Sequence, residues 1–204
     1  MTLGAGIMYG PRELGADGSL SADADRRITD RARVVSEGMS DVVVLPGDAR
    51  KEDRLDGEKM LFAAGAHGGL RVTNDETRMQ CVPGSIFTRK VVIDASCKFE
   101  GAHFKSSDGS NNEPLLVDVI DPGATVLFIG CVFEKMSHHT TAFVNIADGA
   151  KASFIGCKFL PVMDKAGTVV NNLGVAANAG IIGCSDKTGV GAVHVNVTSI
   201  FETT

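Results

Sequence analysis

The sequence predicts an all-β chain in which short parallel strands are wound into a solenoid. One phrase occurs three times, as Phe-Ile-Gly-Cys ending at Cys131 and at Cys157 and as Ile-Ile-Gly-Cys ending at Cys184, with the cysteines 26 and 27 residues apart. A fixed period of this length is typical of solenoids. The 24 glycines and the low aromatic content of 5% also indicate many turns and small side chains, unlike a helical bundle.

The repeat extends backward from each cysteine without a gap. Fourteen residues before the cysteines stand Val117, Phe143 and Val170, and eleven residues before them stand Ile120, Ile146 and Leu173. A coil of about 26 residues cannot bury its apolar side alone, whereas stacking the next coil about 4.8 Å above it pairs every strand in parallel. We therefore expect like residues to lie above like residues, with Ile120, Ile146 and Leu173 in one inward stack.

Two further inward stacks follow from the repeated phrase. We expect one stack to contain Phe128, Phe154 and Ile181, and the other to contain Cys131, Cys157 and Cys184. The chain has five cysteines, an odd number, and no Cys-x-x-Cys pair. This usage favours free, buried thiols over a disulfide framework or a zinc site.

The N-terminal residues differ from the rest, and we divide the chain into residues 1–40 and residues 41–204. Residues 1–20 are rich in glycine and lack periodicity, which predicts an extended arm. Residues 21–37 carry Ile28, Ala32 and Val35 at helical spacing between Ser21 and Gly38, which predicts one short helix. The parallel solenoid is predicted to occupy residues 41–204.

Strands are predicted in order along the second part. Residues 41–46 form an apolar run closed by Pro46, and further short strands are expected at 60–62, 70–73 and 85–88. Residues 65–69 have the composition of a flexible turn. Residues 91–99 end in Cys97-x-Phe99, which resembles Cys131-x-Phe133 and suggests an equivalent place in the repeat.

Two segments complete the expected solenoid. The polar segment 106–114 follows Cys97 and is predicted to be an outward loop that absorbs the longer spacing of 34 residues to Cys131. Residues 190–201 alternate apolar and polar side chains, which predicts one terminal strand. We expect this strand to close the solenoid or to pair at a subunit interface, with Val193, Val195 and Val197 on its buried face.

These stacked Gly-Cys-x-Phe phrases, over roughly residues 85–200, resemble the right-handed parallel β-helix. This is the fold of pectate lyases and of phage tailspikes and other virion proteins. The resemblance implies an architecture and carries no catalytic motif. It also implies a homotrimer, since viral β-helices resemble one another in packing three solenoids side by side.

The candidate chemical groups do not form a recognisable reaction motif. Asp94, Asp118 and Asp121 could supply a carboxylate pair, but turn and surface roles fit them better. His138 and His139 are adjacent and have no third ligand at a recognisable spacing. Phosphate-loop, GxSxG and HExxH signatures are missing. We therefore expect no enzyme activity, no metal and no cofactor.

The net charge of −5 and the pI near 5.5 disfavour nucleic acid and anionic membranes as partners. The resemblance to viral β-helices implies a structural phage virion protein, and we expect a capsid decoration (cement) protein made in the host cytoplasm and located on the capsid surface. It would bind the major capsid protein through the apolar arm residues Leu3, Ile7, Met8 and Tyr9.

Two alternatives remain open. The first is a tailspike or tail-fibre component that binds host surface glycan, with depolymerase activity as an option, although the lack of tryptophan disfavours a sugar groove. The second is a free-standing bacterial lyase, which the small number of coils and the N-terminal sequence disfavour.

Overall fold

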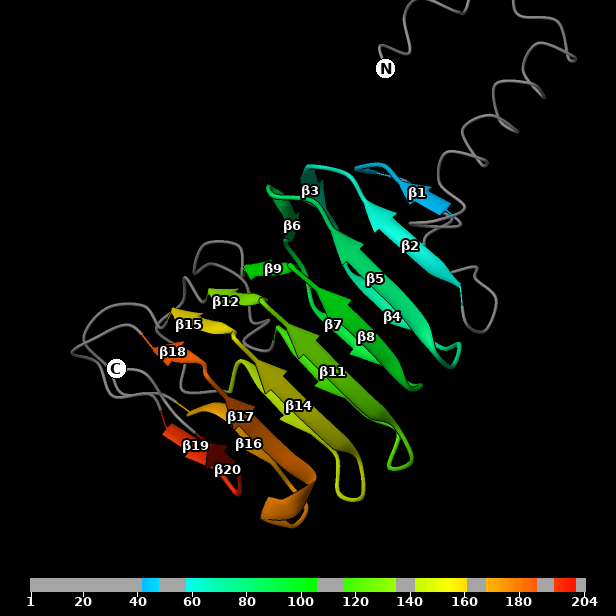
Figure 1. Ribbon diagram of the computed structural model, residues 1–204. Coiled ribbons are helices and arrows are strands. Elements are labelled where there is room, and N and C mark those ends of the chain that lie inside the picture. The colour runs from blue at the N-terminus through cyan, green and yellow to red at the C-terminus, as the bar shows by residue number, and fades with distance from the viewer. Residues whose placement is uncertain are drawn as a thin grey trace, which may run out of the picture. The chain divides into compact units, whose positions relative to one another are not determined.

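The computed structural model describes residues 42–47, 58–105, 116–134, 142–160, 168–186 and 193–200. The predicted arm, the short helix, the domain boundary at residue 40, the loop 106–114 and the His138-His139 pair lie outside the described residues. Within the described residues the chain is built of short strands in three parallel sheets, together with one 3-10 turn at Ala176–Asn178 (Figure 1). The predicted all-β fold with parallel strands is confirmed.

Within the described residues one sheet has eight strands and the other two have six strands each. The first sheet has the order β1-β2-β5-β8-β11-β14-β17-β20, with β1 Val42–Val44, β2 Lys59–Phe62, β5 Thr77–Cys81, β8 Cys97–Glu100, β11 Thr125–Ile129, β14 Lys151–Ile155, β17 Ala179–Ile182 and β20 Thr198–Ile200. The second has the order β3-β6-β9-β12-β15-β18, with β3 Gly65–His67, β6 Ser85–Phe87, β9 His103–Lys105, β12 Val132–Glu134, β15 Lys158–Leu160 and β18 Ser185–Asp186. The third has the order β4-β7-β10-β13-β16-β19, with β4 Leu70–Val72, β7 Val91–Ile93, β10 Val117–Val119, β13 Val144–Ile146, β16 Thr168–Asn172 and β19 Val193–Val195.

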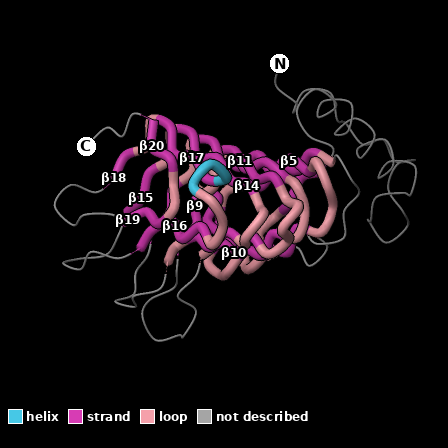
Figure 2. The backbone as a smooth tube through the Cα atoms, turned by 90° about the horizontal axis from the view of Figure 1, so that it is seen from below, coloured by secondary structure: helices cyan, strands magenta, loops and turns pink. Residues whose placement is uncertain are grey.

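The chain visits these sheets in a constant order, which makes the fold a parallel β-helix. From β2 onward each strand of the first sheet is followed by one of the second and then one of the third, and the chain returns to the first sheet beside its starting strand. We call each such set of three strands a coil. Figure 2 shows β11, β14 and β17 along one side of the stacked coils and β10 and β16 along the opposite side.

The core follows from the alternation of side chains along each strand. In β11, Val126 and Phe128 are fully buried while Leu127 and Ile129 point outward and are half-buried. Phe128 pairs with Phe99 in the preceding coil and with Phe154 in the next one, and Phe154 pairs with Ile181. Phe128, Phe154 and Ile181 therefore occupy one buried column.

Phenylalanine rings fill the interior in two columns. In the first sheet, the Phe99 and Phe128 rings and the Phe128 and Phe154 rings stack at centroid distances of 5.7 and 5.0 Å. The second sheet carries its own column, consisting of Phe87, Phe104, Phe133 and Phe159. Rings of the two columns meet edge to face, as aromatic pairs prefer. The three coils that begin with β8, β11 and β14 each bury two of these rings, and the rings join neighbouring coils.

A glycine makes the corner between the first and second sheets. Gly130, Gly156 and Gly183 have φ angles of 58°, 59° and 57°, a left-handed conformation that residues with a side chain rarely adopt. The repeated phrase thus encodes a turn of the backbone between two inward residues, and its recurrence sets the same corner in successive coils.

The predicted equivalence of Cys97 and Cys131 is wrong. Cys97 pairs with Val126, and the residue aligned with Cys131 is Ala102, because His103 pairs with Val132. Residues 91–99 also divide into β7 and β8, which belong to different sheets. The small Ala102 fills the buried position where later coils carry cysteine.

The predicted stack of Ile120, Ile146 and Leu173 is also wrong. Ile146 is fully buried, but it pairs with Val119 and Asn172, while Ile120 and Leu173 are exposed. The corner between Val119 and β11 contains one residue more than the corner that follows Ile146. Residues at the same sequence distance from the cysteine therefore point to different faces of the sheet, because a shift of one residue reverses the direction of a side chain.

Two further expectations need correction. Residues 65–69 are not a flexible turn, since Gly65–His67 is strand β3 and His67 is buried with its Nε2 atom 2.7 Å from the Ala63 carbonyl oxygen. Residues 190–201 are not one strand, because β19 and β20 belong to different sheets. The register shifts between Thr168 and Val170, so that His194 pairs with Val170 and Val195 is exposed.

Candidate functional site

The cysteines of the repeat form a buried row at the corner between the first and second sheets. Cys131, Cys157 and Cys184 are each at most 2% exposed. Their Sγ atoms lie 3.6, 3.5 and 3.4 Å from the carbonyl oxygens of Phe99, Phe128 and Phe154, each in the preceding coil. The thiols therefore donate to backbone carbonyls and tie each coil to the one before it.

The same contact is made by a hydroxyl near the start of the row. Ser85 stands one residue before Ile86, which pairs with His103, so Ser85 aligns with Ala102 and the cysteines. Its Oγ atom donates to the Phe62 carbonyl oxygen at 2.8 Å. A side-chain donor thus recurs at this corner, as a hydroxyl in Ser85 and as a thiol in the three cysteines. This shared contact assigns the cysteine row to the structural core.

Four of the buried thiols, those of Cys81, Cys97, Cys157 and Cys184, are held in their neutral form. Burial raises the pKa of the Cys81 thiol to about 12 and also raises the pKa of Cys97. A hydrogen bond with Cys131, together with burial, raises the pKa of Cys157 to about 12, and the pKa of Cys184 is raised by its hydrogen bond with Cys157 and by burial. All five cysteines are buried, and none of them forms a disulfide. The four thiols with a raised pKa are poor nucleophiles, since the reactive species is the thiolate.

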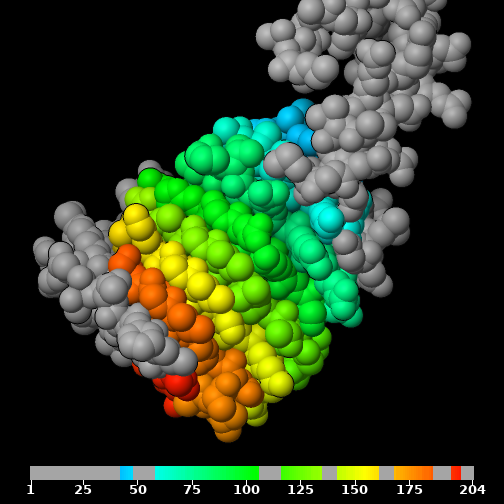
Figure 3. Space-filling model, in the orientation of Figure 1, coloured from blue at the N-terminus to red at the C-terminus, as the bar shows by residue number. Residues whose placement is uncertain are grey.

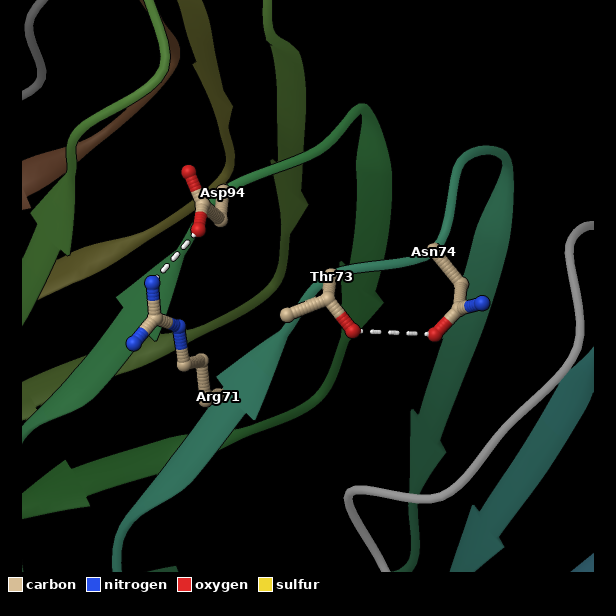
Figure 4. A network of polar contacts seen from close by, with 4 residues as sticks. All are labelled: Arg71, Thr73, Asn74 and Asp94. Atoms are coloured by element: carbon tan, nitrogen blue, oxygen red, sulfur yellow. Dashed lines mark hydrogen bonds and ion pairs between the residues drawn. The ribbon is translucent and has the colours of Figure 1, made fainter.

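The predicted carboxylates are engaged in local contacts near the third sheet. The Arg71 guanidinium Nη2 donates to Asp94 Oδ2 at 2.7 Å, and beside this pair Thr73 Oγ1 donates to Asn74 Oδ1 at 3.1 Å (Figure 4). Asp118 faces the Lys90 ammonium at 3.7 Å. Asp121 Oδ1 accepts the Gly123 backbone N–H at 3.1 Å.

A polar row continues from Asp118 along the outer surface of the third sheet. Asp118 pairs with Asn145, and Asn145 pairs with Asn171, so the three side chains occupy successive coils. Asn171 Nδ2 donates to Asn145 Oδ1 at 3.1 Å. We call Asp118, Asn145 and Asn171 the polar row.

The second sheet carries an ionic cluster on its outer surface. His103 Nε2 and Lys105 Nζ lie 2.8 and 3.1 Å from the two carboxylate oxygens of Glu134, which belongs to the next coil. Burial by itself would raise the pKa of Glu134, but hydrogen bonds from Lys105 and His103 and their charges outweigh it, and the net effect lowers the pKa. The cluster links β9 to β12 and was not identified from the sequence.

The outer surface of the first sheet changes from polar to apolar along the solenoid. Strands β5 and β8 point polar groups outward, including Arg78, Gln80 and the ion-paired Lys98 and Glu100. Strands β11, β14 and β17 lie side by side, as the green, yellow and orange bands of Figure 3 show. Their central and C-terminal outward positions form what we call the apolar face, which consists of Leu127, Ile129, Ser153, Ile155, Gly180 and Ile182.

The predicted arm residues Leu3, Ile7, Met8 and Tyr9 lie outside the residues that the structure describes, so their capsid contacts stay a prediction. Among the described residues, no group of three or more histidine, cysteine, aspartate or glutamate side chains could hold a metal ion. Within that part of the chain no helix is long and apolar enough to cross a membrane.

Two features escaped the sequence analysis although a signal for them exists. The spacing Phe-x-Gly-x-x-Phe joins the two aromatic columns in Phe99–Phe104, Phe128–Phe133 and Phe154–Phe159, and it identifies Gly101 as the earlier corner glycine. The apolar face follows from the same phrase, because the residue between phenylalanine and glycine points outward. Ile129 and Ile155 occupy that position.

Comparisons of the chain with family models, with curated proteins and with solved structures find no significant match.

Proposed function

We propose that this chain is a structural subunit of a phage virion that acts as a capsid decoration (cement) protein. The observation that carries the proposal is the apolar face, where Ile155 and Ile182 are 37% and 38% exposed at paired positions of neighbouring strands. A contiguous apolar patch on an outer sheet surface is suited to contact with protein. The function proposed is therefore adhesion, without catalysis or a cofactor.

The continuous packing of the core supports a mechanical role for the solenoid. Stacked aromatic columns and parallel ladders connect every described coil from β2 to β17 to its neighbours. Close-packed interiors of this kind resist deformation and transmit strain. Such a body could stand on a shell under internal pressure without unfolding locally.

The anchoring is assigned to the N-terminal arm. In this proposal Leu3, Ile7, Met8 and Tyr9 insert into grooves of the major capsid protein, and the β-helix stands on the capsid surface. We further propose a homotrimer, with self-association through the solenoid and capsid binding through the arm. Neither nucleic acid nor membrane is a proposed partner.

Co-sedimentation with shells of the major capsid protein tests this function. The full chain should pellet with the shells saturably, and deletion of residues 1–20 should abolish pelleting while leaving the circular dichroism of the solenoid unchanged. If the full chain stays in the supernatant at every concentration, or if the deletion binds as well as the full chain, the proposal fails.

A second candidate function is a tail component that binds host glycan. The observation in its favour is the polar row, because carboxylate and amide groups at a spacing of about 4.8 Å can bind sugar hydroxyls along an extended chain. A glycan array separates the two candidates. Saturable binding that Asn145→Ala and Asp118→Ala abolish would favour the tail component over the decoration protein.

A further inference from the structure

His67 is a histidine at a position where the following coils carry phenylalanine. It pairs with Phe87, and the later strands of the second sheet continue this inward column with Phe104, Phe133 and Phe159. His67 is 1% exposed. Its ring meets the rings of Phe62 and Phe87 at centroid distances of 5.2 and 5.6 Å. A titratable group therefore occupies the first described position of an aromatic column.

The His67 ring makes one hydrogen bond within the described residues. Its Nε2 atom lies 2.7 Å from the Ala63 carbonyl oxygen. A carbonyl oxygen only accepts, so Nε2 carries the hydrogen of the neutral ring, and a further proton would join Nδ1. In the part of the chain that the structure describes, Nδ1 has no hydrogen-bond acceptor. Protonation would therefore bury a charge and leave its new donor unsatisfied.

No carboxylate of the surrounding strands faces His67. Strands β2 to β6 contain neither aspartate nor glutamate. The described acidic residues next to these strands precede β2 and β5, at the opposite end of the strands from the corner that leads to β3; they are Glu58, Asp75 and Glu76. A positive charge on the His67 ring would thus lack a carboxylate partner among the described residues.

The other ionisable groups around His67 would not stabilise a charged ring either. On strands β2 to β6 and at the corner after β6 they are Lys59, Arg71, Arg78, Cys81, Arg89 and Lys90. The basic side chains repel an imidazolium, and burial raises the pKa of Cys81 to about 12, so this thiol stays neutral. Contact with the rings of Phe62 and Phe87 offsets only part of the cost of a buried charge.

We propose that protonation of His67 opens the first complete coil, β2–β3–β4, so that acidification loosens this coil before those that begin with β8, β11 and β14. Histidine in an unfolded chain binds a proton near pH 6.5. Below that pH the opened coil binds a proton that the closed coil disfavours, and the equilibrium moves toward opening. Within the described residues β3 and β4 pair only with β6 and β7, which favours local opening. The inference does not depend on the capsid function.

Hydrogen exchange of the full chain at about pH 7.5 and about pH 5.5 tests the proposal, because these values bracket the titration of histidine. Protection factors of amides in β2, β3 and β4 should fall at least about tenfold at the lower pH, while those in β11 and β14 change by less than about twofold. His67→Phe restores the column residue, and His67→Gln keeps a hydrogen-bond donor without titrating. In both variants the pH-dependent loss of protection should disappear.

The matched control is Thr88→Val, which removes the hydroxyl that donates to the His67 carbonyl oxygen at 3.0 Å and adds no titratable group. It should weaken the coil equally at both pH values and leave the pH-dependent loss in place, and thermal unfolding should show that every variant folds. Protection in β2, β3 and β4 that is the same at both pH values overturns the proposal. A loss that β11 and β14 share equally, or that both His67 variants retain, overturns it as well.

Discussion

At the residue scale, stability comes from side chains that repeat their contacts from coil to coil. Phe154 shows this, because its ring stacks on Phe128 at 5.0 Å and meets Phe133 and Phe159 edge to face. It connects both aromatic columns across two coils. Its neighbour Ile155 points outward and makes no part of this core.

Truncation of these two neighbours should therefore have unequal effects. Phe154→Ala should lower the free energy of unfolding by about 3–5 kcal/mol, because it removes a buried ring and leaves a cavity. Ile155→Ala should lower it by less than about 1 kcal/mol, since Ile155 is partly exposed. Denaturant titration of both variants measures the difference, and equal losses would mean that the phenylalanine column is not the core.

The cysteines provide a second test at this scale. All five are buried, and the raised pKa values of Cys81 and Cys157 keep their thiols protonated near neutral pH. A thiol reagent should modify none of them rapidly at pH 8, whereas five thiols should react after unfolding. Fast modification of Cys131, Cys157 or Cys184 in the native protein would place the row in contact with solvent.

The ionic cluster gives a pH dependence with a definite sign. Lys105 and His103 lower the pKa of Glu134 in the folded protein, so the carboxylate contributes stability above its unfolded pKa, and this contribution is lost as the pH falls through the folded pKa. The stability difference between the unaltered chain and Glu134→Gln should be constant from about pH 5 to 6 and should shrink as the pH falls below the ordinary glutamate pKa of about 4.3. Chemical denaturation across this range measures it, and a difference that grows toward low pH would have the wrong sign.

At the element scale, the corner glycines determine where one sheet ends and the next begins. Gly156 has a φ of 59° and open space around its Cβ position, so its conformation alone requires glycine. Gly156→Ala should cost about 1–2 kcal/mol. Gly180→Ala, at ordinary φ and also in open space, should be neutral or slightly stabilising. Unfolding of both variants at low concentration tests the comparison, and equal costs would contradict it.

Elements next to a corner of constant length and sequence were predicted correctly, and those next to a variable corner were not. The repeated glycine phrase identified the inward positions of Phe128 and Phe154 because both lie within a few residues of an identical turn. Ile120 and Leu173 were misplaced because a different corner, of variable length, separates them from that phrase. The strands β19 and β20 were merged because only Asn196 and Val197 separate them, and Asn196, with a φ of 52°, makes this corner without a glycine.

The outward groups were harder to foresee than the core. His103 and Glu134 are 31 residues apart in the sequence and meet only because β9 pairs with β12. The apolar face likewise depends on parallel pairing of β11, β14 and β17. Only the Ile of the repeated phrase hinted at it, and an isolated exposed isoleucine is unremarkable by itself.

At the scale of the whole molecule, the proposed function combines two attachments. The arm would hold the protein on the capsid, and self-association would join copies of the solenoid to one another. Several weak contacts that act together raise the overall affinity well above that of each one. A weak self-contact is therefore sufficient when the shell already holds neighbouring copies close together.

Electron microscopy of the native particle tests the central claim most directly. The decoration function predicts density on the outside of the capsid shell that fits the three-sheet coils, with the arm reaching the major capsid protein. Density for this chain at the tail instead, or a particle that lacks the chain, would contradict the account.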